Sequence, residues 1–444
     1  MRSALFLLLT VLPLAAQSTQ TETKVMPLSL RQAVDLALAP TGGLRLQLAS
    51  ELIRQADAQR AFARGVFLPS VDAAYTVRSF TQNLEAFGIQ ISSRGGPFAI
   101  PHFVGPIDTY DARASATWSA FDLSGWTRYK AAGSRLKAAT LDEQAQRNLT
   151  AAAVINAYTA AQRARQLVTT AQANVALAER LLRLAESQKS AGTGTGIDIV
   201  RAQTQIASER QRLIASEEDR NAADLQLMRA MNVPLDARLE LTDELQYKPV
   251  EETPVAAALD VARQERPELK AQSARGTAAK LSYDAAKYER LPSVQAFGDY
   301  GVIGTSPSAG LPTRSVGVKV NIPIYDGGGR DAGRAESASL MRQEQIRTRD
   351  VEQQVDLEVR TSLDALRSAE QQVRAAMETL ALSEKELEQA QRRYEAGVAF
   401  SLEITEAQTR VSRAREQNVN ALFRHRAARV NYGIATGTIE QVLD

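Results

Sequence analysis

The fold of this chain is decided by the stretch Tyr394-Glu395-Ala396-Gly397-Val398-Ala399-Phe400-Ser401-Leu402-Glu403-Ile404-Thr405-Glu406-Ala407-Gln408. It is a short break, marked by one glycine, between a very long helical pattern and a second helical pattern. Glycine accepts the left-handed backbone that often ends a helix. The stretch therefore predicts the tip of a helical hairpin.

A second tip of the same layout is predicted earlier in the chain. Gly192 corresponds to Gly397, and Asp198 corresponds to Glu403, both at an offset of 205 positions. Self-similarity at a fixed offset indicates a repeated structural unit. Gly192 and Gly397 are therefore expected to make equivalent turns at two hairpin tips.

The repeat extends to strand-like segments far from the tips. Leu68-Pro69-Ser70-Val71 recurs as Leu291-Pro292-Ser293-Val294. Pro69 and Pro292 stand where a helical pattern gives way to a strand pattern, because a residue before proline disfavours the helical conformation. Pro323 stands near the end of the last strand pattern. We therefore assign these three prolines to the starts and the end of strands.

These repeats divide the chain into three segments. Residues 1–16 have a basic Arg2, an apolar run and small residues before a polar one, which is the layout of a secretory signal peptide. Residues 17–253 form the first repeat and residues 254–444 the second. In each repeat we expect short helices, a β-hairpin and a long helical hairpin. The β-hairpins fall at about 70–121 and 293–325, the helical hairpins at about 123–231 and 328–436, the connector at about 232–253, and a tail at the C-terminus.

The four strand patterns alternate between apolar and polar residues, as strands with one covered face do. In the first strand, Val71, Ala73, Tyr75 and Val77 share one face. Four such strands do not close a barrel, since a closed barrel in lipid needs at least about eight strands and lipid tolerates no open sheet edge. We therefore expect the chain to oligomerise, and three copies would supply 12 strands in one barrel.

The second long helical pattern is unusually long. Between Gly333 and Gly397 there is neither glycine nor proline, and one helix over this window would span about 95 Å. Small or apolar residues recur at a spacing close to 3.5, which indicates a coiled-coil seam. The predicted seam residues are Val373, Met377, Leu380, Leu387, Ala390 and Tyr394 in this helix, and Leu167, Ala171, Asn174, Ala178, Leu181 and Ala185 in the first long helix.

Composition argues against several function classes. A net charge of +2, with 23% charged residues, does not favour a nucleic-acid surface. Cysteine is absent, so disulfides, thiolate metal sites, thiol catalysis and an N-terminal lipid anchor on cysteine are excluded. The two histidines, His102 and His425, have no zinc-type spacing. We therefore expect no metal, no cofactor and no enzymatic activity.

Charged residues gather at the second tip. Glu403 and Glu406 are three positions apart and so share one helix face. They could simply complement the helix dipole after a Ser401 cap. The position that corresponds to Glu406 in the first repeat is Arg201. Opposite charges at equivalent tips would attract if the tips meet.

Taken together, these motifs resemble the TolC-type outer-membrane efflux protein family of Gram-negative bacteria. The resemblance covers essentially the whole mature chain. Its most specific pieces are the two Leu-Pro-Ser-Val motifs, the run from Ile322 to Gly328, and Tyr394-Glu395-Ala396-Gly397 with the two glutamates that follow.

The resemblance implies a mixed α/β membrane protein. Its homotrimer forms a 12-stranded transmembrane β-barrel, with four strands per chain, continued by a long periplasmic α-helical coiled-coil barrel. The family implies docking to a periplasmic adaptor protein and an inner-membrane pump, with outer-membrane lipid around the barrel and no nucleic acid.

The resemblance also implies roles at the tips. Glu403 and Glu406 match an acidic pair that lines the periplasmic constriction, and Asp198 and Tyr394 match a latch between two hairpins. The family's latch arginine, expected two residues after Gly397, is replaced by Ala399. Arg201 is our candidate for its substitute.

Two functions follow from these patterns. The first is a passive exit duct of a tripartite efflux or type I secretion system, opened at its helical tips. The alternative is a periplasmic coiled-coil adaptor, a structural protein of an envelope transport complex. An adaptor would explain the helical hairpins, but it would leave four apolar-faced strands without a purpose.

Overall fold

A computed structural model shows two compact units in the chain. It describes residues 25–40, 42–88, 103–250, 253–396 and 398–442, so the predicted signal segment 1–16 and the turn residue Gly397 lie outside it. Unit 1 holds the residues up to Ala37, Val154–Tyr247 and Ala376–Phe423, and unit 2 holds the remainder.

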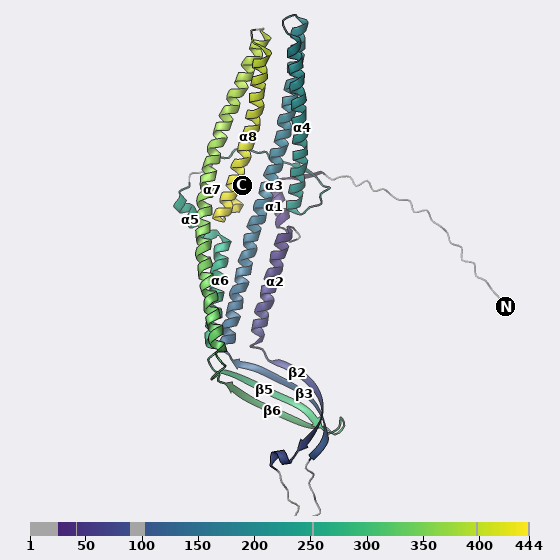
Figure 1. Ribbon diagram of the computed structural model, residues 1–444, viewed down its shortest axis with the longest axis vertical. Coiled ribbons are helices and arrows are strands. Elements are labelled where there is room, and N and C mark those ends of the chain that lie inside the picture. Colours follow the sequence, from purple (N-terminus) through teal and green to yellow (C-terminus); the bar gives the residue numbers. More distant parts are fainter. Residues whose placement is uncertain (1–24, 41, 89–102, 251–252, 397, 443–444) are drawn as a thin grey trace, which may run out of the picture. The chain divides into compact units, whose positions relative to one another are not determined.

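Unit 2 contains a four-stranded antiparallel sheet in the order β2-β3-β5-β6 (Figure 1). The hairpins of the two repeats pair through β3 and β5, where Ala116 lies opposite Gly298. Pro69 and Pro292 directly precede β2 and β5. The strands are β2 (Ser70–Asn83), β3 (Phe103–Phe121), β5 (Ser293–Gly304) and β6 (Leu311–Asn321).

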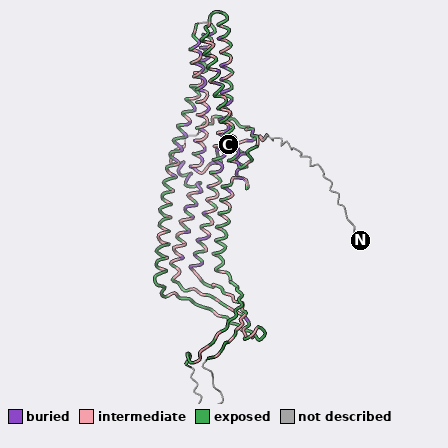
Figure 2. Tube along the Cα trace, turned by 45° about the vertical axis from the view of Figure 1, so that its right-hand side comes forward, coloured by how far each residue is buried: buried purple, intermediate pink, exposed green. Residues whose placement is uncertain are grey.

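The sheet has an apolar face and a polar face. Figure 2 shows its strands as mostly exposed or intermediate. Val71 and Tyr75 on β2 and Val316 and Val318 on β6 are all more than half exposed. On the polar face, Arg113 forms an ion pair with Asp299 and donates a hydrogen bond to Thr313.

The last strand is shorter than predicted. β6 ends at Asn321, and no regular structure follows up to Asp326. Pro323 has no N–H group to donate to a strand ladder, which explains why the alternating pattern of Ile322 and Ile324 does not continue the strand. The prediction of a hairpin reaching residue 325 was therefore wrong at its end.

Four helical segments accompany the sheet in unit 2. They are α2 (Leu44–Gly65), α6 (Pro267–Tyr288), the first part of α3 (Leu123–Ser190) and the first part of α7 (Gly329–Glu395). The short helix α5 (Val255–Glu265) precedes α6. The sequence predicted these helices because proline and glycine are absent from the interiors of the two long ones, apart from Gly125, Gly133 and Gly333 near their starts.

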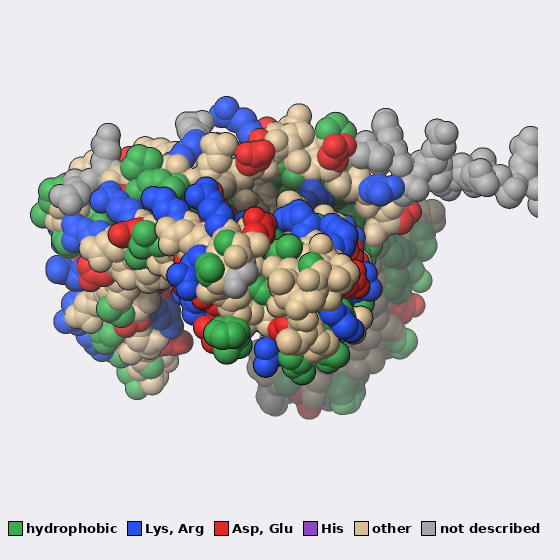
Figure 3. Space-filling model, turned by 90° about the horizontal axis from the view of Figure 1, so that it is seen from above, with side chains coloured by type: hydrophobic (Ala, Val, Ile, Leu, Met, Phe, Trp, Pro, Cys, Tyr) green, Lys and Arg blue, Asp and Glu red, His purple; other side chains and the backbone are tan. Residues whose placement is uncertain are grey.

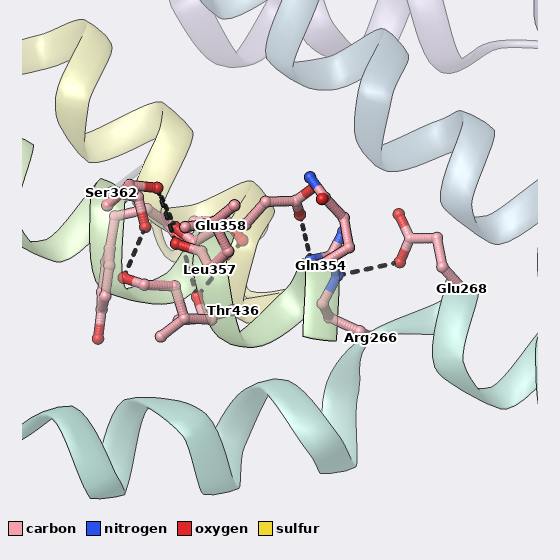
Figure 4. Close-up of polar contacts among 11 residues, drawn as sticks. Arg266, Glu268, Gln354, Leu357, Glu358, Ser362 and Thr436 are labelled. Atoms are coloured by element: carbon pink, nitrogen blue, oxygen red, sulfur yellow. Dashed lines mark hydrogen bonds and ion pairs between the residues drawn. The ribbon is translucent and has the colours of Figure 1, made fainter. Parts of the chain in front are cut away.

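Arg266 fastens the corner between α5 and α6 to α7 (Figure 4). Its buried guanidinium donates a hydrogen bond to Glu358 and lies 3.3 Å from a carboxylate oxygen of Glu268. Gly437, which has a φ of +78°, ends α8 (Ser401–Thr436) against the backbone of Arg266. Because the guanidinium is buried and its two carboxylate partners are partly exposed, losing either partner would leave a buried charge less well paired.

Two helical hairpins lie side by side in unit 1 (Figure 1). They are built from the second part of α3 with α4 (Gly196–Met231), and from the second part of α7 with α8. Small buried residues such as Ala178 and Ala407 allow close approach of the helices. The predicted seam holds at Tyr394 but fails at Met377, which is 49% exposed, because a 3.5-residue repeat drifts around a 3.6-residue helix.

A short parallel sheet in unit 1 was not predicted. It pairs β1 (Val25–Leu28) with β4 (Arg238–Leu241), the latter inside the predicted connector. The helix α1 (Leu30–Leu38) follows β1. Four-residue strands carry too little alternation to be recognised from sequence.

Tyr158 holds this short sheet against α3. Its side chain is fully buried, and its hydroxyl donates to the Leu28 carbonyl at 2.9 Å and lies 3.0 Å from an Asp243 carboxylate oxygen. Burial, together with Asp243, raises the pKa of Tyr158 above its ordinary value, so the hydroxyl keeps its proton.

Among the described residues, no helix is long and apolar enough to cross a membrane.

We predict that Tyr158→Phe loosens the β1–β4 sheet. The lost hydrogen bonds should lower the local opening free energy by about 1–2 kcal/mol, which is roughly 5- to 30-fold faster amide exchange. The amide of Thr242, which donates to the Leu28 carbonyl at 3.1 Å, is the reporter. Tyr283→Phe on α6 serves as the control, and unchanged exchange at Thr242 would contradict the prediction.

Candidate functional site

The two turns of unit 1 share one backbone hydrogen bond. The N–H of Thr193 donates to the Gln188 carbonyl at 3.0 Å, and the N–H of Val398 donates to the Arg393 carbonyl at 3.0 Å. Thr193 and Val398 occupy the same position in the two repeats, as do Gln188 and Arg393. Gly192 has a φ of +78°, a conformation that favours glycine.

The starts of the two following helices differ. Before α4, the N–H and the hydroxyl of Thr195 both donate to the Asp198 carboxylate, at 3.0 and 2.6 Å. Before α8 the equivalent residue is Phe400, which has no polar side chain and is 86% exposed. Glu403 therefore has no such partner, and its carboxylate lies 3.0 Å from Arg393 instead.

Polar contacts join the two hairpins near the turns. Ser401 Oγ donates a short hydrogen bond to Asp198 Oδ1. Arg201 Nη1 lies 3.8 Å from the same carboxylate oxygen and donates to Ser401 Oγ at 3.4 Å. A second link runs from Gln188 Nε2 to the Tyr394 carbonyl at 2.7 Å. We call the group Asp198, Arg201 and Ser401 the tip contact.

Ser401 does not act as the predicted helix cap. It is the first residue of α8, and its hydroxyl donates to Asp198 across the hairpins. The sequence assigned it to a cap because a serine before a helical pattern usually has that role. Only the position of the other hairpin shows that it has a different partner.

The Asp198 carboxylate is stabilised in its charged form. Burial alone would raise the pKa of Asp198, but hydrogen bonds from Ser401 and Thr195, together with Arg201, outweigh burial and lower the pKa. The carboxylate thus stays ionised through the neutral range, where it accepts hydrogen bonds from Ser401 and Thr195.

Tyr394 lies in a hydrophobic cluster behind the turns and is 5% exposed. Burial raises the pKa of Tyr394, and the charge of Asp198 raises it further. The hydroxyl of Tyr394 has no hydrogen-bond partner among the described residues. The other members of the cluster are Leu177, Leu387, Ala390, Ile404, Ala407 and Val411, with Leu181, Leu184 and Ala399 packed against them.

The structure therefore places the predicted latch residues differently from the resemblance. Asp198 and Tyr394 are close enough to influence each other's charge, but Asp198 bonds Ser401 rather than Tyr394. Ala399, where the latch arginine was expected, packs against the hydrophobic cluster. Arg201 lies beside Asp198 and donates a hydrogen bond to Ser401, and its role as a substitute for the latch arginine stays a prediction.

The predicted attraction between Arg201 and Glu406 is not formed within one chain. Glu406 lies 3.8 Å from Arg410, one turn along α8, and Arg410 also binds Glu386 on α7 at 2.7 Å. The side chains of Glu403 and Glu406 are 42% and 56% exposed. Both carboxylates are therefore accessible to solvent, each beside one arginine.

The sequence predicted Asn174 on the helical seam, but not the buried polar layer to which it belongs. Asn174 Nδ2 donates to Ser412 Oγ at 2.8 Å, and Arg212 donates to Glu209 at 3.1 Å and to Ser412 at 3.4 Å. Glu209 is fully buried, and burial raises the pKa of Glu209. The internal repeat offered a sign that Glu209 is buried. Glu209 corresponds to Ala414 in the second repeat, and Ala414 is also buried.

The surface around the turns is partly apolar. Figure 3 looks along the helices onto the turns and shows hydrophobic side chains beside Lys and Arg. The exposed apolar residues near the turns are Ile197, Val200, Val398, Phe400 and Leu402.

In the described part of the chain, no group of three or more acidic or histidine side chains is placed to hold a metal. His102 lies outside the described residues, and burial lowers the pKa of His425 in α8.

Comparison with known proteins gives consistent matches over most of the chain. A family model described as outer membrane efflux protein matches residues 44–233 and 258–433. Protein CyaE of Bordetella pertussis is 28% identical over 412 residues, covering 88% of this chain and 80% of CyaE. The alkaline protease secretion protein AprF of Pseudomonas aeruginosa is 23% identical, covering 75% of this chain and 71% of AprF.

The fold is also similar to solved structures. The open state of the MtrE outer membrane channel of Neisseria gonorrhoeae superposes with a TM-score of 0.75 and 19% identity. The match covers 92% of this chain and 89% of MtrE. The arrangement of four strands and long helical hairpins is thus that of a known outer-membrane channel fold.

We predict that the tip contact is insensitive to pH until the solution is strongly acidic. The pKa of Asp198 is lowered from its ordinary value of 3.8, so its contribution is present above about pH 4 and is lost as pH falls through the lowered pKa. Spin labels at Thr193→Cys and Val398→Cys, in a chain without native cysteine, would report the distance between the turns. A constant distance between pH 8 and pH 5 supports the prediction, and separation of the turns near pH 6 would refute it.

Proposed function

The chain belongs to the outer membrane efflux protein family, the TolC-type channels, and we propose that three copies assemble into one channel gated at the hairpin tips. It is an outer-membrane channel of the kind that serves efflux and type I secretion, with its helices in the periplasm. The family match supports this function over the periplasmic adaptor. The family and the fold are those of channels rather than of enzymes.

The sheet supports a trimer. Among the strands that the structure describes, the outer ones, β2 and β6, each pair on one side only. Lipid offers no hydrogen bonds to the free backbone groups of such an edge, and four strands are too few to curl into a barrel. Pairing β2 of one copy with β6 of the next would close twelve strands in three copies. A barrel of twelve strands has a wider interior than an eight-stranded barrel, whose interior side chains can fill.

The acidic pair supports a cation-preferring mouth. Three copies of Glu403 and Glu406 would place six exposed carboxylates around the tips. Two such charges about 6 Å apart repel by roughly 3 kcal/mol at an effective dielectric near 20, which favours bound cations. Arg393 and Arg410 lie 3.0 and 3.8 Å from these carboxylates and offset part of their charge.

The tip contact supports a gate. It is the short hydrogen bond from Ser401 to Asp198, reinforced by Arg201, that links one hairpin to the other. Opening the tips would break this bond and expose the carboxylate to water, which replaces its partner at low cost. The gate is therefore held at the turns by a few polar bonds, with the hydrophobic cluster around Tyr394 packed behind them.

The apolar residues near the turns support docking of a partner. Phe400 and Val398 are 86% and 68% exposed. Exposed apolar groups of this kind mark protein interaction surfaces. We assign this surface to a periplasmic adaptor, with an inner-membrane pump supplying the energy for transport. The channel itself would then be a passive duct.

We predict that Glu403→Gln combined with Glu406→Gln lowers cation selectivity in planar-bilayer recordings, because the carboxylates set the potential at the mouth. Arg393→Gln should have the opposite effect, since it removes the cation beside Glu403. Glu217→Gln with Glu218→Gln, farther along α4, is the charge-matched control. Unchanged selectivity in the first variant would remove these glutamates from the mouth.

We predict that Ser401→Ala opens the channel more often than the wild type, because Asp198 loses its bond to the other hairpin. Arg201→Ala should act in the same direction but more weakly, because Arg201 lies 3.4 Å from Ser401 Oγ and 3.8 Å from Asp198 Oδ1. Single-channel open probability and uptake of bulky antibiotics are the measurements. Ser190→Ala removes a hydroxyl that bonds only within α3 and should change neither. A closed channel in Ser401→Ala would exclude the tip contact as the gate.

A further inference from the structure

An aromatic cluster lies at the end of the sheet in unit 2. Phe67 and Trp126 meet edge to face with ring centroids 5.6 Å apart, and Trp126 and Tyr129 are 5.8 Å apart. Trp118 Nε1 donates to the Phe67 carbonyl at 3.0 Å. We call Phe67, Trp118, Trp126 and Tyr129 the aromatic collar. It contains both tryptophans of the chain.

The collar stands where strands give way to helices. Phe67 lies between the end of α2 and the start of β2. Trp118 is near the end of β3, opposite Ala296, and continues the apolar face of the sheet through Ala116. Trp126 and Tyr129 occupy the first two turns of α3. The apolar face therefore ends in aromatic side chains on the side of the helices.

Two basic side chains cover the collar. The Arg60 guanidinium carbon lies 5.5 Å from the centroid of the Tyr129 ring, and its Nη2 donates to the Tyr129 hydroxyl at 3.2 Å. Lys130 Nζ lies 5.3 Å from the centroid of the Trp126 ring. Within the described ranges neither has an acidic partner, unlike Arg128 on the same helix, which pairs with Glu289.

Exposure separates the collar from an ordinary packing cluster. Trp118 and Trp126 remain 47% and 44% exposed, although a cluster that only packed α2 against α3 would bury its indoles. Tryptophan and tyrosine gather at membrane–water boundaries, because one part of each ring is apolar and the other polar. Basic side chains near a bilayer attract anionic headgroups.

We propose that the aromatic collar, with Arg60 and Lys130, binds the headgroups of anionic phospholipids in the leaflet nearest the helices. The apolar face of the sheet meets the acyl chains, the indoles lie at the carbonyl level, and the two cations reach the phosphate. This inference rests on the placement of the sheet in the outer membrane. It adds a lipid site that fixes how deep the barrel sits.

The test uses the full-length trimer in phosphatidylcholine vesicles that contain a minor fraction of a brominated lipid. Bromine quenches tryptophan fluorescence at short range, and Trp118 and Trp126 are the only reporters. Brominated phosphatidylglycerol should quench at least about twofold more than brominated phosphatidylcholine at the same fraction, and salt should reduce the difference. Trp126→Phe leaves Trp118 as a single reporter.

Arg60→Gln combined with Lys130→Gln should bring the two quenching values together. The matched control is Arg45→Gln combined with Lys137→Gln, which removes the same charges from the same helices farther from the strands. That control should keep the preference for the anionic lipid.

Two results would overturn the lipid site. Equal quenching by both lipids in the wild type would show that the collar has no headgroup preference. No quenching by either lipid, in a protein that conducts normally, would show that protein covers the collar while the channel function stands. A chain that neither inserts nor conducts would instead contradict the outer-membrane placement itself.

Discussion

The free backbone groups along β2 and β6 are the constraint on which the rest of the structure depends. Lipid cannot satisfy them, so the strands of one chain are incomplete without those of others. A duplicated chain supplies two hairpins per copy, and a threefold assembly then multiplies them into a closed sheet. The need for further copies thus follows from the hydrogen-bonding capacity of four strands, and the proposed trimer meets it.

The helical hairpins show how a duplicated unit becomes asymmetric. Ser401 corresponds to Gly196 in the other repeat, so only one hairpin carries the hydroxyl. Asp198 corresponds to Glu403, and the shorter side chain reaches across to Ser401 while the longer one turns back to Arg393. Two identical tips would offer each other the same groups. Divergence at these pairs gives a donor on one hairpin and an acceptor on the other.

The sequence predicted the fold well because the patterns that indicate it extend over long segments of the chain. A helical window without glycine or proline, four alternating strands and a fixed repeat leave few alternatives, and the matching family confirms the fold class. Short or partner-dependent features were not predictable. β1 and β4 have four residues each, and Ser401 has the sequence context of a cap but bonds another hairpin. The roles of Glu403, Glu406, Asp198, Arg201 and Tyr394 stay predictions.

Two carboxylates of unit 1, Asp198 and Glu209, have pKa values that are shifted in opposite directions. Asp198 has a lowered pKa, so its contact is stable above that pKa and is lost only when pH falls through it. Glu209 has a raised pKa, mainly through burial, so the folded state binds its proton more tightly than an unfolded chain does. As the pH falls, Glu209 therefore takes up its proton before Asp198 does, while the tip contact stays intact. Protonation of Glu209 removes a buried negative charge and leaves Arg212 without its charged partner, so acid acts on the polar layer before it acts on the tips.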